Sequence, residues 1–140
     1  MLKYKLIHPE LLEALARSGH HDQILIADGN FPVHSKPPSH ARFVHLNLAP
    51  GMLTVTDILK VMIDAVPLES ATMMIMDDGK EPAISSDFRQ ILPKDVLLKS
   101  ISRLDFYNAS GESNTTLVIA SGEQRLYANI LLTIGVVKAG

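Results

Sequence analysis

The chain has 140 residues, of which 46% are hydrophobic and 20% are charged, and these proportions indicate neither a disordered nor a membrane protein. The formal net charge is −2 and no cluster of Lys or Arg forms a basic stripe, so nucleic acid and membrane surfaces are not expected as partners. With no cysteine, no recognisable signal peptide and no apolar run of about 18 residues, we expect one cytoplasmic domain spanning residues 1–140.

Two helices are predicted from their end signals. A helix over residues 9–18 follows from a Pro at its first position and from Gly19, which suits the left-handed conformation after a helix end. Thr54 and Asp57 have the spacing of a capping box, and apolar residues then recur at helical spacing over residues 55–66. Shorter helices are predicted within residues 81–92 and 104–109.

Apolar segments between these helices predict strands at residues 24–27, 43–48, 71–76, 94–103, 115–120 and 130–137. We interpret the Met-rich segment 71–76 as a buried strand, and Asp77, Asp78 and Gly79 as a solvated turn. The alternation of elements predicts an α/β fold: a single-domain layered sandwich with a mixed, largely buried sheet and flanking helices. No glycine-rich phosphate loop and no GxSxG turn is present, so neither nucleotide binding by that device nor a serine hydrolase is indicated.

Polar groups flank the buried strand at residues 24–27. Its surroundings read GHHDQILIADGNFP, with His20 before the strand and Asp28 directly after it. Groups at the ends of a rigid strand are held still, which favours a site, although Asp, Gly and Asn are also ordinary turn residues.

Histidines are concentrated in the first third of the chain, at positions 8, 20, 21, 34, 40 and 45. Such clustering is compatible with a metal site, but no pair has the helical i, i+4 spacing. Because His20 and His21 are adjacent, we expect their rings to diverge. The sequence therefore predicts no metal and no cofactor.

A second polar segment, SGEQRLYAN at residues 121–129, precedes the last apolar run. In extended backbone Tyr127 and Asn129 point to the same side, where a hydroxyl and an amide suit a polyol. Alternatively, the Tyr is a half-buried anchor and the Asn caps the start of a strand.

Three segments carry a resemblance to a known family: LARSGHHDQILIADGNFP, SRLDFY and SGEQRLYANILLTIGV, in this order. Together they resemble the D-ribose pyranase and L-fucose mutarotase family over nearly the whole chain. Arg103 before an aromatic pair is similar to the fucose branch, because the ribose branch carries a histidine there. The chain departs from the family pattern at Gly29-Asn30 and in a longer SGESN loop after Tyr107.

The resemblance implies a site, an assembly and a reaction. By position, the catalytic residues would be His20, Asp28 and Tyr127, and the substrate-binding residues would be Arg103, Asn129, Phe106 and Tyr107. The resemblance also implies a ring-shaped homo-oligomer with sites at subunit interfaces. The implied activity is a sugar mutarotase that interconverts α and β anomers of a free monosaccharide, with L-fucose first among the candidates.

Mutarotation needs only proton transfer: a base takes the proton of the anomeric hydroxyl while an acid protonates the ring oxygen. His20 suits a proton shuttle near neutral pH. We expect Asp28 to orient His20 or to accept a sugar hydroxyl, and Tyr127 to be the second proton-transfer group. Arg103 and Asn129 would hold the other hydroxyls. Two alternatives remain: a non-catalytic monosaccharide-binding accessory protein, and a ribose-type pyranase.

Overall fold

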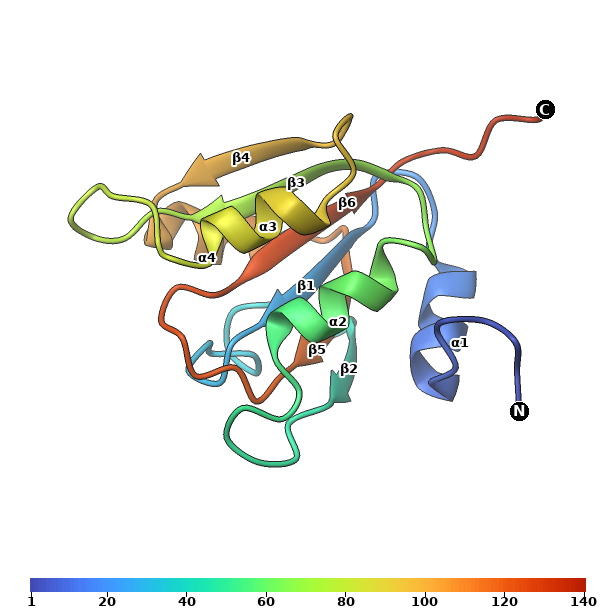
Figure 1. Ribbon diagram of the computed structural model, residues 1–140, viewed down its shortest axis with the longest axis horizontal. Coiled ribbons are helices and arrows are strands. Elements are labelled where there is room, and N and C mark those ends of the chain that lie inside the picture. Colours follow the sequence, from blue (N-terminus) through green and yellow to red (C-terminus); the bar gives the residue numbers. More distant parts are fainter.

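The computed structural model, which describes residues 1–140, is built around one six-stranded mixed sheet (Figure 1). The helices are α1 (Pro9–Arg17), α2 (Val55–Met62), α3 (Ser85–Ile91) and α4 (Arg103–Ser110). The strands are β1 (Gln23–Ala27), β2 (Arg42–His45), β3 (Leu68–Met74), β4 (Leu97–Ile101), β5 (Thr115–Ala120) and β6 (Ile130–Ile134). The predicted α/β fold class is confirmed. None of the helices combines the length and the apolar character needed to span a bilayer.

The direction of the strands decides which chain segments meet. The strand order is β2-β5-β1-β6-β3-β4, and β6 alone runs opposite to the others, antiparallel to both β1 and β3. The carboxyl ends of five strands and the beginning of β6 therefore lie at one edge, which we call the C-terminal edge of the sheet. The opposite edge, which we call the N-terminal edge, holds the beginnings of β1 and β3 and the end of β6.

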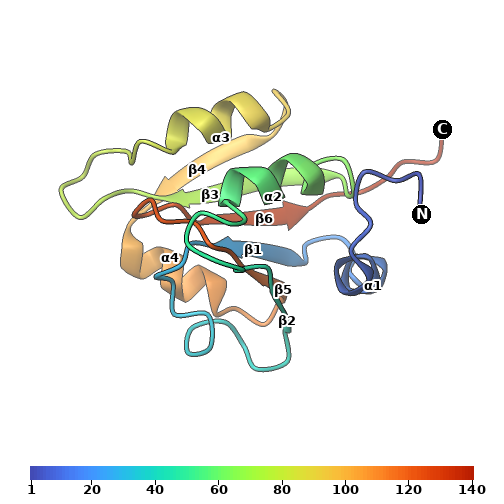
Figure 2. The same cartoon turned by 60° about the horizontal axis from the view of Figure 1, so that its bottom comes forward.

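Helices cover both faces of the sheet, α2 and α3 on one and α4 on the other (Figure 2). Successive side chains of β1 point to opposite faces of the sheet, so this one strand contributes to the cores on both faces. Ile24 and Ile26 pack in the larger core with α1, α2 and α3, whereas Leu25 and Ala27 pack in the smaller core with Phe106 of α4. Residues 24–27 have no exposed surface, which confirms the predicted buried strand.

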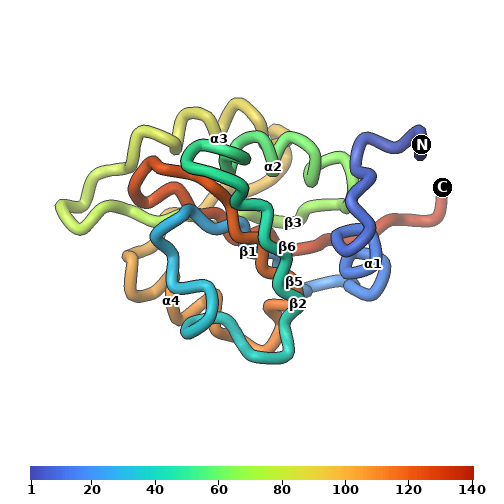
Figure 3. Tube along the Cα trace, turned by 90° about the horizontal axis from the view of Figure 1, so that it is seen from below, coloured from blue at the N-terminus to red at the C-terminus, as the bar shows by residue number.

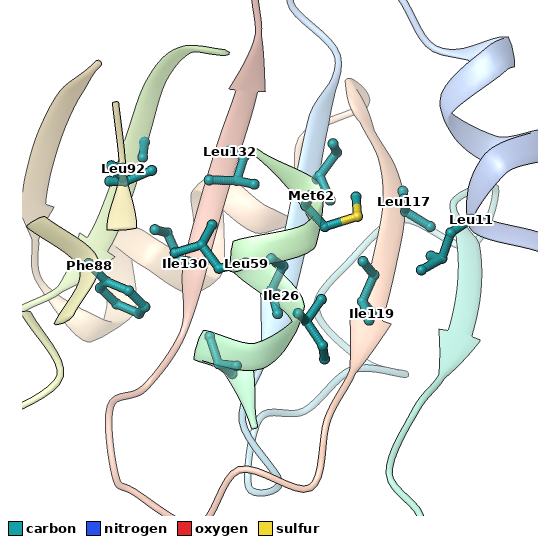
Figure 4. Packing of buried hydrophobic residues seen from close by; sticks show 14 of the residues in the cluster. Leu11, Ile26, Leu59, Met62, Phe88, Leu92, Leu117, Ile119, Ile130 and Leu132 are labelled. Atoms are coloured by element: carbon teal, nitrogen blue, oxygen red, sulfur yellow. The ribbon is translucent and has the colours of Figure 1, made fainter. Parts of the chain in front are cut away.

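Helix α2 fills the centre of the larger core (Figure 4). Leu59 and Met62 are fully buried over β1, β5 and β6, and each such side chain contributes about 1.5–3 kcal/mol by leaving water. The predicted capping box is present, because the Thr54 hydroxyl accepts from the Asp57 N–H and the Asp57 carboxylate accepts from the Thr54 N–H.

Several predicted boundaries are wrong by a few residues. Helix α2 ends at Met62 rather than at residue 66, and β6 ends at Ile134 rather than at residue 137. Gly135 still donates its N–H to the Pro67 carbonyl, but Val136 and Val137 beyond it are exposed. Both chain termini lie at the α1 end of the molecule, away from the segment that precedes β6 (Figure 3).

Candidate functional site

A pocket of about 200 Å³ opens at the C-terminal edge of the sheet. Its volume is below the ~300–1,000 Å³ of sites for drug-sized ligands, so it suits one small molecule such as a single sugar ring. Strand ends and the beginning of α4 meet there because five strands run in the same direction. The lining residues are Asp28, Asn30, Phe31, Met74, Arg103, Tyr107, Leu126, Tyr127 and Asn129.

Asp28 and Asn129 form a buried pair in this pocket. Asn129 Oδ1 accepts from the Asp28 N–H at 2.7 Å, and Asn129 Nδ2 donates to Asp28 Oδ2 at 3.0 Å. Asp28 Oδ2 also accepts from the Ala128 N–H at 3.2 Å, and Oδ1 accepts from the Asn30 N–H at 2.9 Å. With Asp28 only 5% and Asn129 only 2% exposed, both side chains are fixed before any ligand arrives.

Burial raises the pKa of the Asp28 carboxyl, and the hydrogen bonds from Asn30, Ala128 and Asn129 oppose this rise without cancelling it. A carboxyl whose pKa is shifted toward neutrality exchanges protons more readily near physiological pH than an ordinary one. Asp28 is therefore suited to proton transfer or to accepting a strong hydrogen bond from a hydroxyl.

Tyr127 lines the same pocket, but its backbone conformation differs from the predicted one. Its φ of 59° places it in the left-handed region, within a turn before β6, so the prediction of extended backbone at this position is wrong. The turn nevertheless directs Tyr127 and Asn129 to one pocket. The Tyr127 hydroxyl accepts from the Asp77 N–H at 3.3 Å.

Arg103 forms the opposite wall at the first residue of α4. Its Nε donates to Asp77 Oδ1 at 3.1 Å, and its guanidinium carbon lies 5.6 Å from the centre of the Tyr107 ring. The hydrogen bond with Asp77 and then that with Tyr107 raise the Arg103 pKa, so the guanidinium stays charged. Tyr107 also packs edge-on against Phe31 at 5.4 Å between ring centres.

Phe106, which we expected to form a pocket wall, lies behind it. The side chain has no exposed surface and packs against Phe31 at 6.0 Å between ring centres. Consecutive residues of a helix point about 100° apart, so Tyr107 faces the pocket while Phe106 enters the smaller core. Phe106 supports the wall and does not line it.

His20 lies at the N-terminal edge, the other end of β1. A five-residue strand spans about 16 Å, so Asp28 does not orient His20 of the same chain. His20 instead contacts Glu69, with Nε2 and Oε2 2.8 Å apart. The expectation that His20 and His21 diverge is wrong, because their ring centres are 4.3 Å apart and both face Glu69.

The predicted site omitted Asp77, which contacts two lining residues, and four residues of the lining itself: Asn30, Phe31, Met74 and Leu126. Asp77, read as part of a solvated turn, contacts both Arg103 and Tyr127. Met74, which we interpreted as core, is only 2% exposed. Its sulfur lies 3.7 Å from Asn129 Nδ2 in the pocket. Asp77 directly follows the predicted strand 71–76, just as Asp28 directly follows the predicted strand 24–27, and this position could have identified it.

The segment that carries Tyr127 is anchored by a buried carboxylate. Glu123 is 3% exposed and accepts from the first N–H of α2, at Val55, and from Arg125 Nε at 2.8 Å. Burial alone would raise the Glu123 pKa, but the hydrogen bonds from Arg125 and Val55 outweigh it and the pKa is lowered. A Cβ at Gly122 would approach two backbone oxygens to 2.5 Å, so only glycine fits there.

The family model of the RbsD / FucU transport protein family matches residues 1–137. The chain belongs to this family. The resemblance stated from the sequence motifs is confirmed.

Solved members of the RbsD / FucU family share the architecture. FucU from Bifidobacterium longum is 34% identical, with a TM-score of 0.74 over 94% of this chain and 97% of that one. Fucose mutarotase from Streptococcus pneumoniae, solved in complex with L-fucose, is 27% identical, with a TM-score of 0.81 over 99% and 100%. RbsD from Bacillus subtilis, complexed with D-ribose, is 24% identical with a TM-score of 0.82 over 99% and 100%, a likeness of fold.

Proposed function

We propose that this protein is a mutarotase that interconverts the α and β anomers of a free monosaccharide, with L-fucose as the first substrate to test. The observation that carries the proposal is the fixed Asp28–Asn129 pair in a small pocket beside Tyr127 and Arg103. The full-length similarity to a fucose mutarotase solved with L-fucose supports the same reaction. A cytoplasmic location remains a prediction.

The pocket offers the groups that a polyol needs. The Asp28 carboxylate accepts from a hydroxyl, Asn129 and the Arg103 guanidinium hold further hydroxyls, and the faces of Tyr107 and Phe31 supply apolar surface. Asp28 and Asn129 are held by hydrogen bonds to backbone and to each other, and Arg103 is held by Asp77, so little ordering is needed on binding.

The reaction opens and closes a hemiacetal. A base removes the proton from the anomeric hydroxyl, an acid donates a proton to the ring oxygen, and the bond between the anomeric carbon and the ring oxygen breaks. Rotation of the aldehyde followed by closure, with the two proton transfers reversed, gives the other anomer. We assign Tyr127 and His20 to these transfers, and we assign Asp28 to holding a sugar hydroxyl.

His20 must then come from another copy of the chain. Within one chain β1 separates His20 from the pocket, and the His20 side chain, which contacts Glu69, is 51% exposed and so accessible to a neighbour. We therefore propose a ring-shaped homo-oligomer in which His20 of one copy completes the pocket of the next.

Proton NMR saturation transfer on equilibrated L-fucose tests the function. We expect saturation to pass between the α and β anomeric signals at a rate that rises with protein concentration, and we expect His20→Ala to abolish this exchange while far-UV circular dichroism is unchanged. Near-normal exchange in the folded His20→Ala protein would contradict the role of His20.

The same experiment separates the two alternatives. Faster exchange with D-ribose than with L-fucose would indicate a ribose-type pyranase, and Arg103 makes the fucose reaction the expected one. Binding of L-fucose, D-ribose or D-galactose without exchange would indicate a non-catalytic monosaccharide-binding accessory protein and would contradict the proposed reaction.

A further inference from the structure

The N-terminal edge of the sheet carries a second cluster of polar side chains, remote from the pocket in the same chain. It consists of His20, His21 and Glu69, all of them exposed, and one ligand atom from each lies within 4.8 Å of the others. Glu69 presents a different oxygen to each ring: Oε2 lies 2.8 Å from His20 Nε2, and Oε1 lies 3.5 Å from His21 Nε2.

These separations fit one small cation. Zinc bound tetrahedrally by imidazole nitrogen and carboxylate oxygen at about 2.0–2.1 Å has ligand atoms about 3.3 Å apart. The His20–Glu69 and His21–Glu69 separations, 2.8 and 3.5 Å, lie on either side of this value. Two imidazoles and one carboxylate are also a ligand set that zinc uses with its fourth position open to water.

The backbone conformation at His21 positions one side chain of the cluster. His21 has a φ of 71°, a conformation uncommon for a side chain other than Gly or Asn, which places its ring edge-on to that of His20. The conformation is locked, since the His21 N–H donates to the Ile134 carbonyl at 3.0 Å and its carbonyl accepts from Asn114 Nδ2 at 2.8 Å.

Glu69 is positioned by an irregularity in β3. Leu68 pairs with Ile134 and Ser70 pairs with the preceding residue Thr133, so Glu69 is an extra residue without a partner in β6. A bulge of this kind re-aims the side chain that it carries. Gly135 packs against the Glu69 backbone, where an added Cβ would lie 3.4 Å from the Glu69 nitrogen.

We propose that His20 Nε2, His21 Nε2 and a carboxylate oxygen of Glu69 form a Zn²⁺ site. Binding requires the His20–Glu69 hydrogen bond to give way to metal coordination and the three ligand atoms, now within 4.8 Å of one another, to close around the ion. A consequence rests on the proposed function: zinc bound to His20 would hold this imidazole away from the pocket of a neighbouring copy, and anomer exchange would be inhibited.

Isothermal titration calorimetry of the untagged full-length protein with ZnCl₂ tests the site without reference to activity. We expect about one Zn²⁺ per chain, and no comparable heat with MgCl₂, because Mg²⁺ prefers oxygen ligands. His21→Asn, which keeps a residue that tolerates positive φ, and Glu69→Gln should each weaken binding more than about 10-fold.

A second pair of imidazoles provides the matched control. His34 and His45 lie 3.2 Å apart between their Nε2 atoms and are distant in sequence from the proposed ligands. We expect His34→Asn to leave zinc affinity unchanged. No binding by the wild type, equal affinity in His21→Asn and Glu69→Gln, or a loss confined to His34→Asn would each overturn the site.

Saturation transfer with and without zinc then tests the consequence, each protein being normalised to its own zinc-free rate. We expect zinc to inhibit the wild type at concentrations at which the calorimetric site fills, and to inhibit His21→Asn only at concentrations more than about 10-fold higher. Zinc binding by a protein without exchange activity would contradict the proposed function and leave the metal site standing. Exchange activity without zinc binding would contradict the metal site and leave the proposed function standing.

Discussion

Asp28 and Glu123 are two buried carboxylates whose environments have opposite effects. Asp28 is surrounded by neutral donors, so burial dominates and its pKa is raised. Glu123 faces the charged Arg125, whose hydrogen bonds outweigh burial and lower its pKa. The first environment suits a strong hydrogen bond with a ligand hydroxyl, and the second suits a permanent charge that anchors the loop before β6.

Removing the Tyr127 hydroxyl tests the proton-transfer assignment. Tyr127→Phe keeps the ring that packs at the edge of the smaller core, so the fold should be retained. We expect anomer exchange to fall by about 10²- to 10⁴-fold, the usual contribution of one acid–base group. Saturation-transfer NMR measures this, with Tyr4→Phe at an exposed site as the control. Exchange within a few-fold of wild type in Tyr127→Phe would remove Tyr127 from the chemistry.

The lowered pKa of Glu123 predicts a pH-dependent contribution to stability. A carboxylate whose folded pKa is depressed stabilises the fold above its unfolded pKa, about 4.3, and loses this contribution as pH falls through the folded value. Glu123→Gln should therefore cost about 2 kcal/mol at pH 7, because buried donors lose a charged acceptor.

Urea unfolding at one fixed protein concentration measures that difference. The gap between wild type and Glu123→Gln should narrow once the pH falls below about 4. Glu112→Gln, at an exposed position, is the control and should behave like wild type. A gap that is constant with pH would show that the charge of Glu123 is not what stabilises the loop.

At the scale of elements, helix α2 links the core to the site. Its buried face packs on the centre of the sheet, and its first N–H donates to Glu123 of the loop that leads to Tyr127. The negative charge of Glu123, next to the N-terminus of α2, also interacts favourably with the helix dipole. Glu123 therefore joins the beginning of α2 to the loop that carries Tyr127.

Removing the α2 cap should destabilise the protein measurably. Thr54→Ala deletes the acceptor of the Asp57 N–H, and we expect a loss of about 1 kcal/mol. Thr54→Ser keeps the hydroxyl and should lose much less. Thermal unfolding followed by circular dichroism compares the two, and an equal loss in both variants would assign the effect to the Thr54 methyl group rather than to the cap.

At the scale of the whole molecule, His20 and the pocket lie at opposite edges of one sheet. If the pocket is completed by a neighbouring copy, two inactive variants should complement each other. His20→Ala supplies an intact pocket and Tyr127→Phe supplies an intact His20. In rings assembled at random from equal amounts, about one quarter of the sites combine both intact parts.

Co-refolding the two variants tests this sharing. We expect exchange to recover to about one quarter of the wild-type rate, whereas each variant refolded alone should remain inactive. No recovery in mixed oligomers, shown to be mixed by native mass spectrometry, would contradict a shared site.

Sequence patterns were sufficient to predict the α/β class, the buried strand β1, the capping box of α2 and the family. These follow from local periodicity, end signals and motifs, which the chain carries without reference to distant contacts. The sequence also singled out Asp28, Arg103, Tyr107, Tyr127 and Asn129, which the structure brings to one pocket.

The remaining features depend on contacts between residues far apart in the chain. The reversed β6 brings Asn129 beside Asp28, and the sheet separates His20 from both. The turn at Tyr127, the burial of Phe106, the role of Asp77 and the convergence of His20 with His21 depend on long-range pairing. Sequence periodicity tells which face of a strand is buried, but the order and direction of strands decide which strand ends meet, and that is what assembles a site.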